Sequence, residues 1–279
     1  MSTQSNQITF GERTYLMGIV NVTPDSFSGD GLMDSNKWVD SALKLANRSI
    51  FNGADIIDIG GESTRPSKIY SEVTPVSALE EERRVIPVIT RLNKICDVPI
   101  SIDTQKASVA EKALKAGATM VNDVSMLKDP AMSYVAASNQ AILIITHNRD
   151  IKQSNDVIEL IETDLGEAIE KSVSDGMKRS RIIVDPGIGF GKTTQQNLKI
   201  LKNLRKLKNE LRMPLLVGTS RKSFIGNVLD NEVTDRLMGT AATVSIAISN
   251  EVDIVRVHDV KEIRDVSRMT DAIVRGSNH

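Results

Sequence analysis

The chain has 279 residues with 35 basic and 36 acidic side chains, a balance that gives no electrostatic reason to expect nucleic acid or an anionic membrane as a partner. No apolar run approaches the roughly 18–20 residues needed to span a bilayer, and the polar residues 1–7 do not resemble a signal peptide. Cys96 is the only cysteine, so an intrachain disulfide is excluded and we expect a protein of the reducing cytoplasm.

Short apolar segments recur along the chain and predict eight β-strands. After a polar tail and a small expected hairpin in residues 1–14, we expect these strands at residues 16–20, 55–59, 99–102, 119–121, 141–145, 181–184, 214–217 and 253–257. Between them, apolar residues at helical spacing predict amphipathic helices. The clearest stripes are Val39, Ala42, Leu43, Ala46 and Ile50; Val85, Ile89, Leu92 and Ile95; Leu201, Leu204, Leu207 and Leu211; and Val260, Ile263, Val266, Met269 and Ile273.

The expected strands are continuous apolar runs, which is typical of parallel strands covered by helices. Eight strand–helix units predict an α/β fold, a closed (β/α)8 TIM barrel, and the absence of a linker predicts a single barrel domain over residues 15–279. An open doubly wound sheet is the competing topology. It usually carries a G-x-G-x-x-G turn after the first strand, where this chain has Asn21-Val22-Thr23-Pro24-Asp25.

Polar side chains follow every expected strand. In a barrel these positions meet on one face, where the chemistry takes place. Each residue alone has a structural explanation: Asp103 could cap the next helix, and His147 could be a satisfied core histidine. The whole series is better explained by one polar pocket. Its members are Asn21, Asp58 with residues 62–65, Asp103, Asn122, His147, Asp185, residues 218–222, Arg256 and His258.

The sixth expected strand delivers Asp185 to its own tip, and a glycine-rich turn follows. The spacing Gly187-x-x-x-Gly191-Lys192-Thr193 looks like a P-loop but has three residues between its glycines where that motif needs four, so we discount it. Isolated histidines and a lone cysteine argue against a tightly held zinc. Mg²⁺ carried mainly by substrate phosphates remains open.

The order of these motifs resembles the dihydropteroate synthase family of pterin-binding enzymes. Residues 17–28 look like its first signature and residues 58–66 like its second; residues 101–104, 122–125, 182–192, 220–223 and 256–260 are similar to the remaining blocks. The resemblance implies a (β/α)8 fold and a transferase that joins dihydropterin-methyl diphosphate to 4-aminobenzoate in folate biosynthesis, releasing diphosphate. It also implies Mg²⁺ as cofactor and a homodimer.

The resemblance further implies a role for each matching residue. The residues expected to bind the pterin are Asp103, Asn122, Asp185 and Lys222. Those expected to bind the diphosphate are Asn21, Thr64, Arg256 and His258, with Asn21 also binding the metal. Those expected to bind the aminobenzoate are Phe27, Arg65, Pro66, Phe190 and Ser223. Lys222, Asp103, Asp25 and Arg65 are the expected catalytic residues. These roles make physical sense, since a carboxylate such as that of Asp185 accepts hydrogen bonds from an amino group and an adjacent ring N–H together.

The chain departs from the family pattern in three places. Ser67-Lys68 stands where Gly is frequent after Thr-Arg-Pro, Thr146-His147-Asn148 replaces a frequent Met-His-Met, and the Gly and Asp order is changed in residues 27–31. Two other functions stay open. One is a pterin-binding methyltransferase that uses a methylated folate, which shares the Asp and Asn tips but lacks the loops at residues 24–27 and 64–66. The other is a barrel that binds pterin without catalysis.

Overall fold

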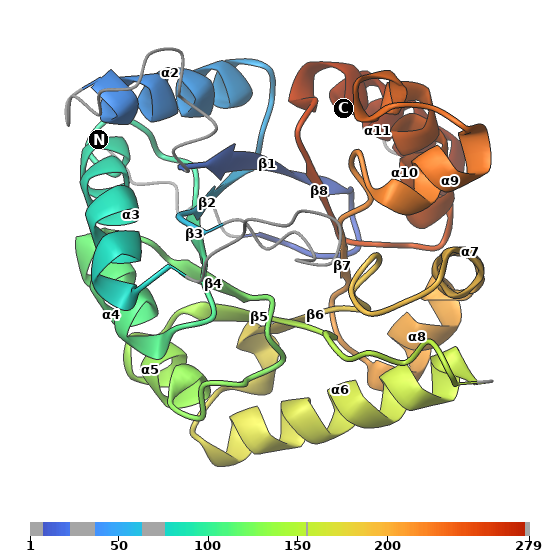
Figure 1. Ribbon diagram of the computed structural model, residues 1–279, viewed down its shortest axis with the longest axis horizontal. Coiled ribbons are helices and arrows are strands. Elements are labelled where there is room, and N and C mark those ends of the chain that lie inside the picture. Colours follow the sequence, from blue (N-terminus) through green and yellow to red (C-terminus); the bar gives the residue numbers. More distant parts are fainter. Residues whose placement is uncertain (1–7, 23–36, 63–75, 155, 277–279) are drawn as a thin grey trace.

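The computed structural model describes residues 8–22, 37–62, 76–154 and 156–276. Strands and helices alternate along this part of the chain (Figure 1). The strands are β1 (Tyr15–Asn21), β2 (Ile56–Gly60), β3 (Ile100–Asp103), β4 (Met120–Asp123), β5 (Ile142–Thr146), β6 (Ile182–Asp185), β7 (Leu216–Val217) and β8 (Ile254–Val257). Each strand lies within two residues of its expected position, so apolar runs alone located the whole sheet.

The sheet is parallel throughout and closes on itself. Its strands follow the order β6-β5-β4-β3-β2-β1-β8-β7, and a parallel bridge between Val184 and Leu215 joins the two ends of that order. The backbone N–H of Val184 also donates to the Pro214 carbonyl at 3.0 Å. This closure confirms the predicted barrel and excludes the open doubly wound sheet.

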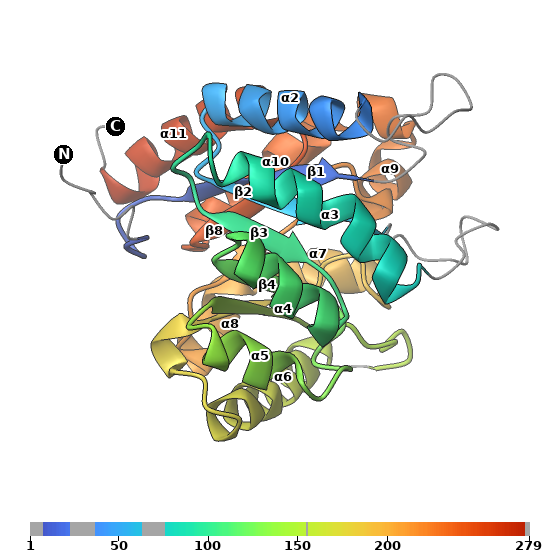
Figure 2. The ribbon, with the colours of Figure 1, turned by 90° about the vertical axis from the view of Figure 1, so that its left-hand side faces the viewer.

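Helices form the outer layer around the barrel (Figures 1 and 2). They are α2 (Lys37–Phe51), α3 (Ala78–Leu92), α4 (Ala107–Ala116), α5 (Met132–Ser138), α6 (Val157–Ser174), α7 (Thr194–Lys202), α8 (Leu204–Leu211), α9 (Ser223–Leu229), α10 (Leu237–Ser249) and α11 (Val260–Arg275), with single turns η1 (Arg179–Arg181) and η2 (Val233–Asp235). Among the described residues, no helix is long and apolar enough to cross a membrane.

Three details of the expected helices were wrong. The stripe at residues 201–211 belongs to two helices, because Asn203 leaves the helical conformation and its side-chain amide donates to the Lys199 carbonyl at 2.7 Å. Ile95 lies beyond the end of α3 and is exposed. On α11, Met269 and Ile273 are 63% and 72% exposed, so the apolar stripe is wider than the face that the barrel covers.

A turn occupies residues 8–14, where a hairpin was expected. The Tyr15 hydroxyl accepts from the Thr9 N–H at 2.9 Å and donates to the Thr9 carbonyl at 3.1 Å. This one side chain satisfies both backbone groups of Thr9, so the segment needs no partner strand.

The barrel interior is divided into an apolar layer and a polar layer. A buried cluster near the amino ends of the strands contains Tyr15, Met17, Ile56, Met120, Ile144, Ile183, Leu216 and Ile254. Side chains two residues apart on a strand share a face. Two residues after members of that cluster, the same inward face therefore carries Asp58, Asn122, Thr146, Asp185 and Arg256. The core thus supports a polar floor at the carboxyl end of the barrel.

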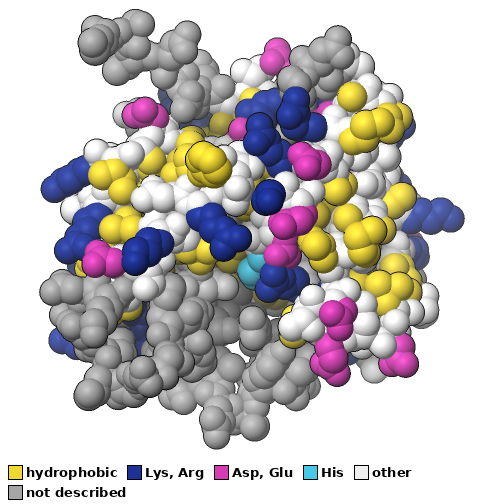
Figure 3. All heavy atoms as spheres, turned by 90° about the horizontal axis from the view of Figure 1, so that it is seen from above, with side chains coloured by type: hydrophobic (Ala, Val, Ile, Leu, Met, Phe, Trp, Pro, Cys, Tyr) yellow, Lys and Arg dark blue, Asp and Glu magenta, His cyan; other side chains and the backbone are white. Residues whose placement is uncertain are grey.

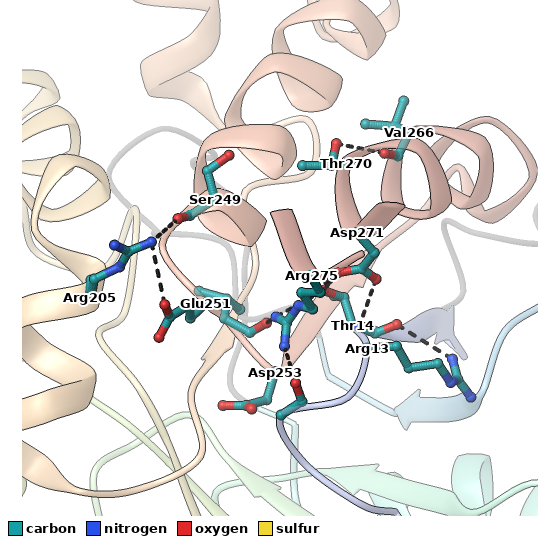
Figure 4. A network of polar contacts seen from close by, with 12 residues as sticks. Arg13, Thr14, Arg205, Ser249, Glu251, Asp253, Val266, Thr270, Asp271 and Arg275 are labelled. Atoms are coloured by element: carbon teal, nitrogen blue, oxygen red, sulfur yellow. Dashed lines mark hydrogen bonds and ion pairs between the residues drawn. The ribbon is translucent and has the colours of Figure 1, made fainter. Parts of the chain in front are cut away.

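A buried carboxylate joins the residue before β1 to the last helix (Figure 4). Asp271 of α11 accepts from the Thr14 N–H at 2.8 Å and from its hydroxyl at 3.0 Å, and it pairs with Arg275 at 2.9 Å. Arg275 in turn donates to the Val252 carbonyl at 2.8 Å, just before β8. These contacts hold β1 and β8 in register at the end of the barrel opposite the polar floor.

We expect Asp271→Ala to lower the free energy of unfolding by about 3 kcal/mol, because it leaves the buried Thr14 donors and the Arg275 guanidinium without their acceptor. Urea denaturation followed by circular dichroism measures the change. Asp265→Ala, an exposed position on the same helix, is the matched control. Equal stability of the two variants would contradict the structural role of Asp271.

Candidate active site

Side chains from four strands form one hydrogen-bonded network across the carboxyl end of the barrel. Asp58 accepts from the Asn122 amide at 3.1 Å and from Arg256 Nε at 2.6 Å. Arg256 Nη2 donates to Asp103 at 2.6 Å. The strands β2, β3, β4 and β8 thus bring together residues that are far apart in sequence, as the barrel prediction required.

Two carboxylates share the single guanidinium of Arg256. Burial raises the pKa of Asp103 to about 7, an effect that Arg256 opposes and the neighbouring charge of Asp58 increases. Asp58 is completely buried and Asp103 nearly so. Arg256 therefore supplies the counter-charge that these two buried carboxyl groups share, and it holds the pKa of Asp103 below the value that burial alone would give.

Several buried oxygen atoms in this layer have no hydrogen-bond partner within the described part of the chain. They are Oδ1 of Asp58, Oδ1 of Asp103, Oδ1 of Asn122, Oγ of Ser101 and Oγ1 of Thr146. Native proteins rarely bury acceptors unpaired, and the exceptions gather where something else binds. The site therefore suits a ligand that presents hydrogen-bond donors to the barrel floor.

Asp185 lies at the tip of β6 and is oriented by the glycine turn. Its Oδ1 accepts from the Gly187 N–H at 2.7 Å. Gly187 has φ +70°, and a Cβ there would lie 1.9 Å from the His147 carbonyl oxygen, so no other residue fits. Burial raises the pKa of the Asp185 carboxyl, while the Lys222 ammonium and the Gly187 N–H oppose that shift.

Lys222 joins the glycine turn to the Arg256 network. Its ammonium donates to the Ile188 carbonyl and lies 4.8 Å from the centroid of the Phe190 ring. A Cβ placed on Gly218 would lie 3.6 Å from Arg256 Cβ and 4.0 Å from Lys222 Nζ. Burial lowers the pKa of Lys222 to about 8, and the Asp185 carboxylate opposes this shift.

The remaining described residues of the expected anion site border the same opening. A Cβ placed on Gly60 would lie 3.6 Å from Asn21 Oδ1 and 3.5 Å from Asp103 Cβ, so the Asn21 amide points into the polar layer. His258 follows β8, and its Nδ1 lies 3.0 Å from the Ser220 hydroxyl. Asn21 therefore lies near Asp103, and His258 lies against Ser220, two residues after Arg256 in the chain.

Arg221 and Ser223, on either side of Lys222, lie in different surroundings from it. Arg221 pairs with Asp259, with Nε 3.0 Å from Oδ2, so its charge needs no bound anion. Ser223 is exposed at the start of α9. Asp25, Phe27, Thr64, Arg65 and Pro66 lie outside the described residues.

His147 was expected in the polar pocket, with a satisfied core histidine as the alternative, and the structure shows the core histidine. It is fully buried, with Nε2 3.0 Å from Asp164 and Nδ1 3.0 Å from Lys192 Nζ. Burial lowers the pKa of His147 to about 4, so the ring is neutral. No three His, Cys, Asp or Glu side chains gather as a metal site in the described ranges.

Sequence reasoning left Ser101 and Thr146 out of the site and gave Asp58 no function. Their signal was the alternation along each strand: Ser101 lies two residues before Asp103, and Thr146 lies two residues after the interior Ile144. Polar residues that share the inward face of a strand with a site residue or an interior core residue, two positions away, therefore belong to the candidate site.

Comparison with known proteins gives a consistent family. The model of the family described as "Pterin binding enzyme" matches residues 17–258. The chain is 48% identical to the dihydropteroate synthase of Clostridium beijerinckii, over 99% of this chain and 100% of that one. It is 47% identical to the dihydropteroate synthase of Bacillus subtilis, over 99% and 95% of the two chains.

Solved structures agree. A dihydropteroate synthase from Clostridium difficile, crystallised in the presence of pteroic acid, superposes with a TM-score of 0.90 at 49% identity, over 96% of this chain and 100% of that one. The Xanthomonas albilineans dihydropteroate synthase with 4-aminobenzoic acid gives a TM-score of 0.87 at 39% identity, over 94% and 93%.

We expect Arg256→Met to lower the free energy of unfolding by about 3–5 kcal/mol near pH 8, because Asp58 and Asp103 lose their counter-charge. The loss shrinks as the pH falls toward about 6, since the Asp103 carboxyl, whose pKa is raised, takes up a proton in the folded state before it does so in the unfolded chain. Urea denaturation at several pH values tests this, with Lys261→Met on α11 as the exposed control. A loss that does not change with pH would contradict the shared-charge interpretation.

Proposed function

From the premise that this chain belongs to the pterin-binding enzyme family, and within it to the dihydropteroate synthases, we propose how its residues carry out the reaction. The enzyme is a transferase that condenses dihydropterin-methyl diphosphate with 4-aminobenzoate, giving dihydropteroate and diphosphate. The observation that carries the residue assignment is the layer of unpaired buried oxygens at the carboxyl end of the barrel, beside the Asp185–Lys222 pair.

The pterin ring fits this layer by its hydrogen-bond pattern. A pterin presents an amino group and a ring N–H side by side, and a carboxylate accepts both. Asp185 keeps lone pairs for this contact beyond the one that receives the Gly187 N–H. Asp103 and Asn122 each offer a further oxygen, and Lys222 donates to the acceptor atoms of the ring.

The leaving diphosphate would meet the cationic side of the opening. Arg256 and His258, from the end of β8, and Asn21, from the end of β1, are proposed for this contact, and neutralising the departing charge favours cleavage of the C–O bond. The pterin ring delocalises the positive charge left on its methylene, the amine of aminobenzoate then attacks that carbon, and the arylammonium that forms gives one proton to water. An arylamine needs little activation, so the site needs no strong general base.

Phe190 would form part of the wall for the aminobenzoate ring, since its ring lies beside Lys222. Ser223 at the start of α9 is proposed for the carboxylate of the same substrate. The other aminobenzoate residues, Phe27, Arg65 and Pro66, and the catalytic Asp25 and Arg65 are proposed on family resemblance, as is Thr64 for the diphosphate.

Mg²⁺ is proposed as the cofactor, with Asn21 as its protein ligand. The fit is through one amide oxygen that points into the polar layer, next to the Asp103 carboxylate. Mg²⁺ binds oxygen, keeps several waters and is often held by few protein groups plus substrate phosphates. When bound, it would supply positive charge to the diphosphate. A cytoplasmic location is proposed because a single cysteine suits a reducing compartment.

An assay of diphosphate release tests the function. With dihydropterin-methyl diphosphate and Mg²⁺ present, we expect release to require 4-aminobenzoate in equal amount, and we expect EDTA to abolish it and added Mg²⁺ to restore it. Methyl transfer from a methylated folate, without diphosphate release, would favour the methyltransferase instead. Pterin binding without turnover in any condition would favour a non-catalytic barrel.

We also propose that two copies of the chain associate through α10 and α11. The helices pack side by side, with Thr270 Oγ1 3.3 Å from Ser245 Oγ. Met238 and Ile246 of α10 are exposed, as are Met269 and Ile273 of α11. Figure 3, the view from above Figure 1, shows hydrophobic side chains on both sides of this face, and those on the right lie on the side of α9, α10 and α11 in Figure 1. Exposed apolar patches of this kind mark protein interfaces, and twofold pairing is the commonest way to cover one.

We expect Ile273→Asp to convert the dimer into a 30.5 kDa monomer, because it places a charge in the apolar contact. Light scattering after size-exclusion chromatography measures the mass. Leu79→Asp, an exposed apolar position on α3, is the matched control and keeps the mass unchanged. A monomeric unmodified chain, or a dimer that survives Ile273→Asp, would refute this interface.

A further inference from the structure

Lys192 is a buried lysine to which the reaction gives no role. It is 7% exposed, and its ammonium lies 3.0 Å from His147 Nδ1, 3.1 Å from the His147 carbonyl, and 2.9 Å from the carbonyls of Gly187 and Phe190. These are more acceptors than an ammonium group has protons. All the protons of the Lys192 ammonium group are therefore used in hydrogen bonds within the protein. A P-loop lysine would instead bind a phosphate, so this agrees with discounting that motif.

Lys192 also fixes the state of the histidine beside it. Because Nδ1 of His147 accepts from the ammonium, its Nε2–H donates to Asp164 at 3.0 Å. Arg149 binds the same carboxylate from the surface, with Nη1 2.9 Å and 3.1 Å from its two oxygens. A continuous line of polar contacts thus runs from α6 through His147 to Lys192.

The turn that Lys192 holds carries three contacts of the pterin site. Its Gly187 N–H orients the Asp185 carboxylate, its Ile188 carbonyl receives the Lys222 ammonium, and its Phe190 ring lies against the same lysine. The two turn carbonyls that Lys192 binds belong to Gly187 and Phe190, one on each side of Ile188. Fixing these two carbonyls therefore fixes the groups that position Asp185 and Lys222.

We propose that Lys192 is a positioning residue for pterin binding, holding the Gly187–Gly191 turn so that Asp185 and Lys222 face the ring. This inference rests on the proposed function of those two residues. Burying an ammonium group is unfavourable, and neutral hydrogen-bond donors would be enough to hold the carbonyls of this turn. The charge of Lys192 therefore calls for an explanation beyond these hydrogen bonds. Burial lowers the pKa of Lys192 to about 7, so in acidic solution the side chain is charged and opposes the rise in the pKa of Asp185 that burial causes.

The first test is Lys192→Met, which keeps an unbranched side chain of similar length but removes its hydrogen-bond donors and its charge. The probe is 6-hydroxymethylpterin, and its dissociation constant is measured by calorimetry. We expect binding to weaken by about tenfold or more, while the KM for 4-aminobenzoate at saturating pterin substrate changes by less than about threefold. Lys202→Met, an exposed lysine on α7, is the matched control and leaves both constants unchanged.

The pH profile separates positioning from general loss of structure. Asp185 faces Lys222, Arg256 and Lys192, and His147 follows the neighbouring strand as a neutral ring. Removing one of the three cations raises the pKa of Asp185, so pterin binding in Lys192→Met should begin to fail at a higher pH as the solution is acidified. An unchanged acid limb, or pterin affinity within about threefold of the unmodified chain, would overturn the proposal.

Lys192→Gln, which keeps a neutral two-proton donor, replaces Lys192→Met if the latter does not fold, with the same shift of the acid limb expected. Asp185→Asn distinguishes failure of this inference from failure of the proposed function. If Asp185→Asn weakens pterin binding and folded Lys192 variants do not, only the role of Lys192 is wrong. If Asp185→Asn also leaves the affinity unchanged, the assignment of the pterin site itself is wrong.

Discussion

The pairing of Arg256 with Asp58 and Asp103 is the interaction on which the site depends. It joins β8 to β2 and β3 across the barrel and gives two buried carboxyl groups a shared counter-charge where the apolar interior ends. Burying carboxyl groups at that depth is unfavourable unless a counter-charge lies beside them. With Arg256 as the counter-charge, their oxygen atoms can accept hydrogen bonds from a ligand. Because Arg256 also borders the opening toward Lys222, the same guanidinium that stabilises the floor lies where a leaving diphosphate would be neutralised.

The glycine turn after β6 supplies the other half of the site. Asp185 by itself is a strand-tip carboxylate; the Gly187 N–H gives it an orientation, and the Ile188 carbonyl brings Lys222 opposite to it. The turn has no regular secondary structure of its own, and Lys192 binds it to the end of β5. The proposed recognition of the pterin is thus linked to a buried lysine that would not touch the ligand.

The eight strands and their polar tips could be predicted because an apolar run followed by a polar residue is a local signal. The partners of those tips could not, since Asp58 and Arg256 are 198 residues apart and nothing local to either one indicates the pair. Local spacing also misled in part: the stripe at residues 201–211 contains a break at Asn203, and the glycines before Lys192 imitate a phosphate loop although they serve to bring carbonyls to its ammonium. Met269 and Ile273 fit a helical stripe, but a stripe does not tell whether the barrel or a second chain covers it.

The central claim is that Asp185 is an ionised recognition carboxylate for the pterin, set on a floor that Arg256 stabilises. A crystal structure with 6-hydroxymethylpterin bound tests it most directly. We expect the amino group and the adjacent ring N–H to donate to Asp185, with Asp103 and Asn122 within hydrogen-bond distance of the ring and Lys222 on its acceptor side. A pterin bound elsewhere, or one whose donors do not meet Asp185, would contradict the account.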